Sequence, residues 1–374
     1  MVDVDRSSSS HWDLHERRVR ISESVTIAPP TGGGGQYIAR LPDGSIVTNA
    51  SDKEGAYSLI SFDEGRTWAR AEDHHAGCPW NHVQCLADGT ILAYEAFPCE
   101  SLGDGKFTYK MWRGKDTYDT LRPETCTMFI PDAVPGTGDD GKVDAIKGMV
   151  YWSPRITEFP DGRLLATMYG WFAEDTIPMT DPGFQAGIDK GIPYRRCRSI
   201  AIVSEDRGCI WRYVSTIASP LTGTTGPCEP SMLRVGNGDL IAILRVGRRT
   251  ALYQARSRDN GQTWGPPQPL HTFGVAPYAI VMSDGTVACA YGLKRDLWGG
   301  QQRREARIMF SFDGGHSWAI DKLVYGGEAG SYPGICEISP GVLLFSYDPS
   351  VWSMPGDVKP VRRCVRVARI TVLP

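Results

Sequence analysis

Four copies of one eight-residue pattern decide the fold: SFDEGRTW (61–68), SEDRGCIW (204–211), SRDNGQTW (257–264) and SFDGGHSW (311–318). Each copy reads Ser-x-Asp-x-Gly-x-x-Trp. The aspartate carboxylate can accept backbone N–H groups in a tight turn, the glycine supplies a positive φ, and the tryptophan anchors the strand that follows. A repeated strand–turn–strand signature is typical of a β-propeller, in which blades of four strands surround a central axis.

A second repeat predicts the number of blades. An apolar strand, a turn rich in Asp, Asn and Gly, and another apolar strand together indicate a β-hairpin. This pattern occurs in YIARLPDGSIVT (37–48), HVQCLADGTILA (82–93), RITEFPDGRLLA (155–166), SMLRVGNGDLIA (231–242), YAIVMSDGTVAC (278–289) and GICEISPGVLLF (334–345). Because a blade takes roughly 40–50 residues, the two longest intervals indicate insertions around 100–150 and 172–198. We therefore expect an all-β fold, a six-bladed β-propeller.

Both ends of the chain are strand-like, in RRVRISESVTI (17–27) and RCVRVARITVL (363–373). Neither end has a complete blade of its own. Pairing the N- and C-terminal strands within one blade would close the ring and remove exposed sheet edges. The expectation is a single domain over 1–374, with 1–16 as a flexible tail.

Composition excludes several classes of protein. The formal charge of −3 excludes a strongly basic nucleic-acid binder, and no apolar run approaches the ~18 residues of a membrane span. The 10 cysteines show no C-x-x-C pair and no zinc spacing, so we expect neither a metal nor a cofactor. The first residues lack the apolar region of a signal peptide. Together with buried free thiols, this indicates a cytoplasmic protein, or a secreted one if a signal sequence has been removed.

Residues just ahead of each hairpin should meet at one mouth of the central channel, because the first strand of each hairpin is the innermost strand of its blade. Aligned on the turn, Glu229 and Tyr332 share one position, eight residues before it. Two residues further along, the aligned position holds side chains that could contact a sugar or, alternatively, only pack: Tyr37, His82, Arg155 and Tyr278.

The eight-residue pattern is the Asp box, or BNR repeat, of the sialidase (neuraminidase) superfamily, which this chain resembles. The stretch EPSMLRVGNGDLIAILR places Glu229 and Arg245 sixteen residues apart, as in the fourth blade of that family. GSYPGICEISPG supplies Tyr332, as in its sixth blade. QQRREARIMFSFDGG offers Arg303 or Arg304 for the arginine of its fifth blade, and the spacing favours Arg303.

The resemblance implies an exo-acting, retaining glycosidase that cleaves a terminal acidic sugar, sialic acid or a related one. Tyr332 would be the nucleophile, Glu229 the base that accepts its proton, and Asp52 the general acid, with Glu54 close to it in the sequence. A neutral phenol suits this reaction because a carboxylate nucleophile would be repelled by the substrate's own carboxylate.

The resemblance also implies a cluster of arginines that binds the sugar carboxylate. Arg245 and Arg303 fill two of its positions, but Gly34 stands where the family has a further arginine. Arg155 is a candidate to compensate from another side.

This departure keeps other functions open. One alternative is a sialidase-fold glycosidase or polysaccharide lyase for another sugar, such as an arabinan, a rhamnoside or a uronate. Another is a non-catalytic propeller that binds carbohydrate, for which the Asp boxes alone would suffice. A carbohydrate is the expected partner in each case, and the oligomeric state is not indicated.

Overall fold

The structure is a computed structural model that describes residues 18–28, 34–52, 55–71, 82–94, 100–134, 149, 153–189, 191, 194–296, 302–327, 332–349 and 364–373. The tail expected at 1–16 lies outside these residues. Strands dominate the described part, whose helical elements are the 3-10 helices η1 (Tyr118–Thr120) and η2 (Pro182–Phe184) and the short α2 (Gln185–Ile188). No helix described here is long and apolar enough to cross a membrane.

Three separate antiparallel sheets each contain four strands that follow one another in chain order, and we call such a unit a blade. Blade one contains β3 (Gly34–Arg40), β4 (Ile46–Asp52), β5 (Gly55–Ser61) and β6 (Ala69–Arg70). Blade four contains β16 (Cys228–Arg234), β17 (Leu240–Arg245), β18 (Ala251–Ser257) and β19 (Gln268–Phe273). Blade five contains β20 (Val275–Val281), β21 (Val287–Asp296), β22 (Gln302–Ser311) and β23 (Ile320–Gly327).

Blades two and three are joined in one nine-stranded sheet. Blade two contains β7 (His82–Cys85), β8 (Thr90–Tyr94), β10 (Lys106–Lys115) and β11 (Arg122–Phe129), with β9 (Glu100–Gly103) paired to β10. Blade three contains β12 (Thr157–Glu158), β13 (Leu164–Gly170), β14 (Arg198–Ser204) and β15 (Ile210–Ala218). The outer strands β11 and β15 pair in parallel, with Thr127 opposite Ile210.

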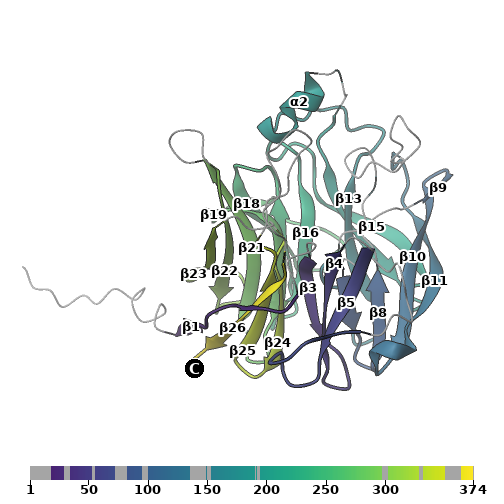
Figure 1. The fold of residues 1–374 in the computed structure, drawn as a ribbon. Coiled ribbons are helices and arrows are strands. Elements are labelled where there is room, and N and C mark those ends of the chain that lie inside the picture. Colours follow the sequence, from purple (N-terminus) through teal and green to yellow (C-terminus); the bar gives the residue numbers. More distant parts are fainter. Residues whose placement is uncertain are drawn as a thin grey trace, which may run out of the picture.

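The two predicted insertions fare differently. Within the stretch expected as an insertion around 100–150, β10 and β11 are blade strands, so that expectation was too broad. The stretch expected at 172–198 does separate β13 from β14 and contains η2 and α2. Because β13 runs antiparallel to β12, this insertion leaves the blade at the end where the innermost strand begins. Figure 1 shows α2 at that end of the molecule.

The two ends of the chain meet in blade six. β1 (Val19–Ile21) and β2 (Val25–Thr26) both pair antiparallel with β26 (Arg366–Val372). β26 in turn pairs with β25 (Val342–Tyr347), and β25 with β24 (Gly334–Ser339). The described strands therefore form six groups, one for each of the six hairpin repeats in the sequence.

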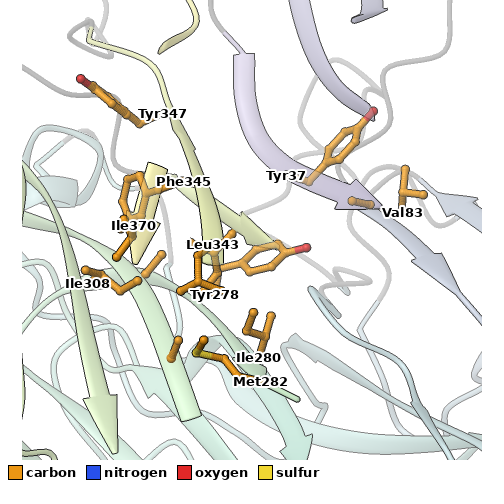
Figure 2. Close-up of a cluster of buried hydrophobic side chains, with 14 of the residues drawn as sticks. Tyr37, Val83, Tyr278, Ile280, Met282, Ile308, Leu343, Phe345, Tyr347 and Ile370 are labelled. Atoms are coloured by element: carbon orange, nitrogen blue, oxygen red, sulfur yellow. The ribbon is translucent and has the colours of Figure 1, made fainter. Parts of the chain in front are cut away.

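The first strands of the blades surround a common centre. β24 lies against β3, β3 against β7, β16 against β20, and β20 against β24, while β13 lies against β16. Blades two and three are also linked at their turns, where the Ala87 amide donates to Glu158 at 2.7 Å. Side chains from several blades meet in one apolar cluster, and Figure 2 shows Tyr37, Tyr278 and Phe345 among them.

The Asp boxes form the turns between the third and fourth strands of blades one, three, four and five. In the first copy, Asp63 accepts the backbone amides of Arg66 and Thr67 at 3.0 and 2.8 Å. The Ser61 hydroxyl donates to Asp63 and accepts the amide of Gly65, whose φ is +81°. Asp206, Asp259 and Asp313 accept amides in the same way in the other copies. The turn chemistry predicted from the repeat is confirmed.

Candidate active site

Glu229 lies at the start of the innermost strand of blade four, in an unusual backbone conformation. Its φ is +48°, and Pro230 follows it. The register between β16 and β17 shifts between Cys228 and Ser231. A shift of this kind redirects a side chain, and a positive φ at a non-glycine residue is a strained state that such sites retain. The glutamate is thereby directed out of the strand pairing, although its side chain is almost fully buried.

The neighbouring blade repeats this geometry and uses it to hold Glu229. Ala276, at the same alignment position in β20, also has a φ of +48° and precedes a proline. The register between β20 and β21 shifts between Val275 and Tyr278. The freed Ala276 amide donates to Glu229 Oε2 at 2.8 Å. The paired shifts therefore fix the carboxylate between two blades.

Two more side chains share the other oxygen of this carboxylate. Arg245, the last residue of β17, lies opposite Cys228 and donates from Nη1 to Glu229 Oε1 at 2.7 Å. The Tyr332 hydroxyl, just ahead of blade six, donates to the same oxygen at 2.8 Å. The structure thus brings together Glu229 and Tyr332, which share a position in the repeat alignment, and Arg245, which the resemblance placed with Glu229.

Electrostatics keep the Tyr332 phenol neutral and the Arg245 guanidinium charged near neutral pH. Burial, followed by the negative charge of Glu229, raises the pKa of Tyr332 well above its ordinary value, although Arg245 opposes the shift. Burial lowers the pKa of Arg245, but the charge of Glu229 and its neighbours outweighs this, so the net pKa is well above the ordinary value. The arrangement is a neutral phenol hydrogen-bonded to a carboxylate, which is a nucleophile and its base.

A wall beside this group comes from the insertion between β13 and β14. Asp181, fully buried, accepts the backbone amide of Arg248 at 2.7 Å and the Thr224 hydroxyl at 3.1 Å. The Arg248 guanidinium lies 4.8 Å from the centroid of the Phe184 ring. Sequence reasoning missed Arg248 and Asp181. Arg248 stands three residues after Arg245 in RVGRRT, which could have identified it, whereas Asp181 lies in no motif.

The aligned residues Tyr37, His82, Arg155 and Tyr278 form a second group near the axis. The His82 ring lies 5.6 Å from that of Tyr94 and 6.4 Å from that of Tyr278. Arg155 Cζ lies 6.0 Å from the Tyr278 ring centroid. Burial lowers the pKa of His82 to about 3, so the imidazole is neutral.

The Arg155 guanidinium also interacts electrostatically with two cysteines. Its charge lowers the pKa values of Cys85 and Cys336, which burial raises more strongly. Cys85 is the last residue of β7, whereas Cys336 lies midway along β24. A cavity of about 600 Å³, lined in part by Arg40 and Cys85, opens at the hairpin turns of blades one and two. The described neighbours of Arg155 are therefore Tyr278, Cys85 and Cys336, and they do not include Glu229 or Tyr332.

The remaining predicted residues are placed less directly. Asp52, at the end of β4, forms an ion pair with Arg70 at 3.0 Å. Arg303 lies in β22 opposite Arg295, but its side chain is outside the described residues, as is Glu54. Gly34 pairs with Ala50 in blade one. The described residues contain no cluster of three or more His, Cys, Asp or Glu side chains that could hold a metal ion.

The ring of antiparallel blades and the Asp boxes define a sialidase-like β-propeller with BNR repeats. The chain belongs to the BNR repeat-like domain family, whose sequence profile matches residues 151–344, more than half of its length.

Solved structures show the same fold. A protein of unknown function from Dyadobacter fermentans has a TM-score of 0.64 at 17% identity, covering 95% of this chain and 99% of that one. A Penicillium chrysogenum α-L-arabinanase complexed with arabinobiose has a TM-score of 0.59 at 16% identity, covering 94% and 99%. A Hadza microbial sialidase has a TM-score of 0.55 at 16% identity, and the match covers 95% of this chain but 66% of the sialidase. No curated protein matches the sequence significantly.

Proposed function

We propose that this protein is an exo-acting, retaining glycoside hydrolase of the sialidase fold. The observation that carries the proposal is the hydrogen bond of 2.8 Å from the Tyr332 hydroxyl to Glu229, with Arg245 bound to the same oxygen. Packing alone does not need a buried carboxylate with three donors. A phenol held against such a carboxylate is prepared to lose its proton as it attacks.

In the first step, the Tyr332 oxygen forms a bond to the anomeric carbon while Glu229 accepts the phenol proton. The bond from that carbon to the leaving-group oxygen breaks, and this oxygen takes a proton from a general acid. We assign that role to Asp52. Its carboxyl group would have to be protonated before the reaction and would then lose its ion pair with Arg70. In the second step, water attacks the same carbon, the acid residue now acts as base, and Tyr332 leaves with the proton from Glu229.

Arg245 contributes by holding Glu229 in position. Its ion pair with Oε1, together with the Ala276 amide on Oε2, fixes the carboxylate from both sides. A base that is held rigidly needs no reorganisation when the proton moves. The neutral phenol accommodates a substrate that carries a carboxylate beside the reacting carbon, which favours a terminal acidic sugar.

A second candidate is a sialidase-fold glycosidase for an arabinose-containing glycan. Two observations favour it: Gly34 stands where the sialidase pattern has an arginine, and the fold resembles that of an α-L-arabinanase at a TM-score of 0.59. The same Tyr332–Glu229 pair would serve either substrate. The two candidates therefore differ in what binds the sugar and not in the reacting groups.

The test is turnover of a panel of aryl glycosides that contains a sialoside, an arabinofuranoside, a rhamnoside and a uronide. We expect at least one to be cleaved with retention, and Tyr332→Phe to remove most of that activity. Tyr213→Phe is the matched control, because Tyr213 lies exposed on β15. Cleavage by elimination would indicate a lyase. Binding of the sugars without turnover would indicate a carbohydrate-binding propeller.

A further inference from the structure

We propose that Cys126 and Cys209 form a thiol modification site, in which a hydroperoxide oxidises Cys209 and Cys126 then closes a disulfide between blades two and three. The site lies where β11 pairs with β15. It involves neither Glu229 nor Tyr332, so it is independent of the proposed function. The strand register, the unequal exposure of the two thiols and a neighbouring cation carry the proposal.

The strand register places the two cysteines opposite each other. Thr127 on β11 pairs in parallel with Ile210 on β15, and the Thr127 amide donates to the Cys209 carbonyl at 3.0 Å. Cys126 and Cys209 each lie one position earlier in the chain, so they are the adjoining pair of this register. Because neighbouring strands lie about 4.8 Å apart, we expect the two Cα atoms to lie within the range of about 4.4–6.8 Å that a disulfide requires.

The two cysteine side chains also start from the same face of the sheet. Met128 pairs with Trp211 in this register, and both side chains are fully buried. Since side chains alternate along a strand, the residues two positions earlier, Cys126 and Cys209, belong to the same face. Tyr109 on β10 pairs with Cys126, and its hydroxyl accepts the Trp211 indole N–H at 2.9 Å, as expected if the groups share one side.

The two thiols differ in their access to solvent, and this difference sets the order of the reaction. Cys209 is exposed, whereas Cys126 is buried. Burial, and next the charge of Cys209, raises the pKa of Cys126 to about 12, so Cys126 remains a thiol near neutral pH. Of the cysteines that the structure describes, Cys209 is the exposed one, and a solute therefore reaches it first.

The second Asp box of the chain fixes the backbone of Cys209. Asp206 accepts the amide of Cys209 at 3.1 Å and that of Ile210 at 2.8 Å. The equivalent position of the other three copies holds a longer polar side chain: Arg66, Gln262 and His316. The turn itself thus does not require a cysteine at this position.

Arg113 places a positive charge at the sulfur atom of Cys209. Its Nη2 donates to Cys209 Sγ at 3.4 Å, and its Nε donates to Glu124 at 2.9 Å, which orients the guanidinium. Reactive cysteines lie in electropositive and solvent-accessible surroundings. The guanidinium is therefore positioned to stabilise negative charge that develops on this sulfur during oxidation.

The reaction takes two steps and consumes one hydroperoxide. In the first step, the Cys209 sulfur attacks a peroxide oxygen and the O–O bond breaks, which gives a sulfenic acid and an alcohol, or water where the oxidant is hydrogen peroxide. In the second step, the Cys126 sulfur attacks the Cys209 sulfur and the S–O bond breaks. The departing hydroxide takes the Cys126 proton and leaves as water. The two thiols together lose two electrons and two protons, and the peroxide accepts them.

The test treats the reduced full-length chain with hydrogen peroxide, blocks the remaining thiols and identifies cross-linked tryptic peptides by mass spectrometry. Trypsin releases the two cysteines in separate peptides, 116–142 and 208–212, each of which contains a single cysteine. We expect these two peptides to be joined, and dithiothreitol to separate them. The unfolding temperature of the oxidised protein should rise by about 5 °C, because the bond constrains the unfolded chain.

Two cysteine variants separate the steps. Cys126→Ala should stop at the sulfenic acid, which dimedone traps on Cys209. Cys209→Ser should leave Cys126 as a thiol under the same treatment. Cys364→Ser is the matched control, because Cys364 is a half-buried cysteine just ahead of β26. It should form the cross-link as the unmodified protein does.

An arginine variant tests the cation. Arg113→Met should slow formation of the disulfide several-fold, whereas Arg212→Met, which removes an exposed arginine from β15, should not. An unchanged rate in Arg113→Met overturns the role of this arginine. The proposal is overturned if Cys209 is linked to another cysteine or to a second chain. It is equally overturned if Cys209 is oxidised to the sulfinic acid while Cys126 stays reduced.

Discussion

The Tyr332 hydroxyl and Glu229 Oε1 are joined by a hydrogen bond of 2.8 Å although the residues are 103 positions apart in the sequence. Glu229 begins blade four, and Tyr332 lies just ahead of blade six. Both occupy the same position relative to their hairpin turns, so the geometry of the ring brings them together. The pair consequently depends on the whole propeller and not on one local segment.

Replacing Glu229 by Gln should weaken both activity and folding. The change leaves Arg245 buried without its counter-ion, which typically costs ~3–5 kcal/mol of unfolding free energy. Loss of the base should lower turnover by about 10²- to 10⁴-fold. Urea unfolding and steady-state rates measure the two effects. The double variant Glu229→Gln/Arg245→Met should recover stability but not turnover, and recovery of both would show that Glu229 is structural.

Tyr332→Phe should change how stability depends on alkaline pH. The pKa of Tyr332 is raised in the fold, so its contribution to stability is fully present below the unfolded value of ~10 and is lost as pH rises toward the folded pKa. The unfolding free energy of the unmodified protein should therefore fall more steeply above pH ~10 than that of the variant. Parallel curves would mean that burial and the charge of Glu229 do not keep the phenol neutral in the folded protein.

His82→Asn should reduce sensitivity to acid. Burial lowers the pKa of His82 to about 3, so the folded state excludes a proton that the unfolded state binds below its ordinary value of 6.5. The stabilising contribution is present above pH ~6.5 and is lost as pH falls toward 3, with a total on the order of a few kcal/mol. The expected result is a shallower decline of unfolding free energy between pH 7 and 4 in the variant. An unchanged decline would show that His82 does not titrate in this way.

Gly65→Ala should destabilise the first Asp box more than Gly285→Ala destabilises a hairpin turn. Both glycines have a positive φ, of +81° and +86°. An added Cβ at Gly65 would lie 2.5 Å from the buried side chain of Leu344, whereas at Gly285 it would meet nothing within 4 Å. Backbone strain alone costs ~1–2 kcal/mol, and overpacking adds ~1–3 kcal/mol. Equal losses in thermal unfolding would show that Leu344 moves aside freely.

Asp52→Asn should slow cleavage most for substrates whose leaving-group oxygen is strongly basic and must be protonated before it departs. A general acid matters little for a nitrophenyl leaving group and much for an alkyl one, so the loss should reach about 10²-fold or more only with the alkyl glycoside. Comparing the variant with the unmodified protein on both substrates measures the difference. Equal losses on both would mean that Asp52 serves only to hold Arg70.

The repeat made much of the fold and part of the site predictable. The Asp boxes and hairpins follow from local turn chemistry, and a shared alignment position was enough to relate Glu229 to Tyr332. Blade two has no Asp box, and the sequence therefore does not mark β10 and β11 as blade strands. The sequence shows which residues face the axis, but not how far a long side chain such as that of Arg155 extends along it. Arg248 and Asp181 meet only through the packing of a non-repeated segment, which leaves no periodic signal.

Arg303 is a further member of the predicted arginine cluster, and the described structure places its backbone in β22, opposite Arg295. The expectation that Arg303 contacts the substrate therefore stays a prediction from the resemblance.

The parallel pairing of β11 with β15 has a mechanical consequence for the ring. Blades two and three share one continuous sheet, so they cannot tilt independently of each other. On the side of blades four, five and six, the corresponding ties include the bonds of Glu229 to the Ala276 amide and to Tyr332. The residues proposed to carry out the reaction thus also connect sheets that share no strand pairing. A substrate that displaces one of these hydrogen bonds would weaken the contact between the blades that form its own binding site.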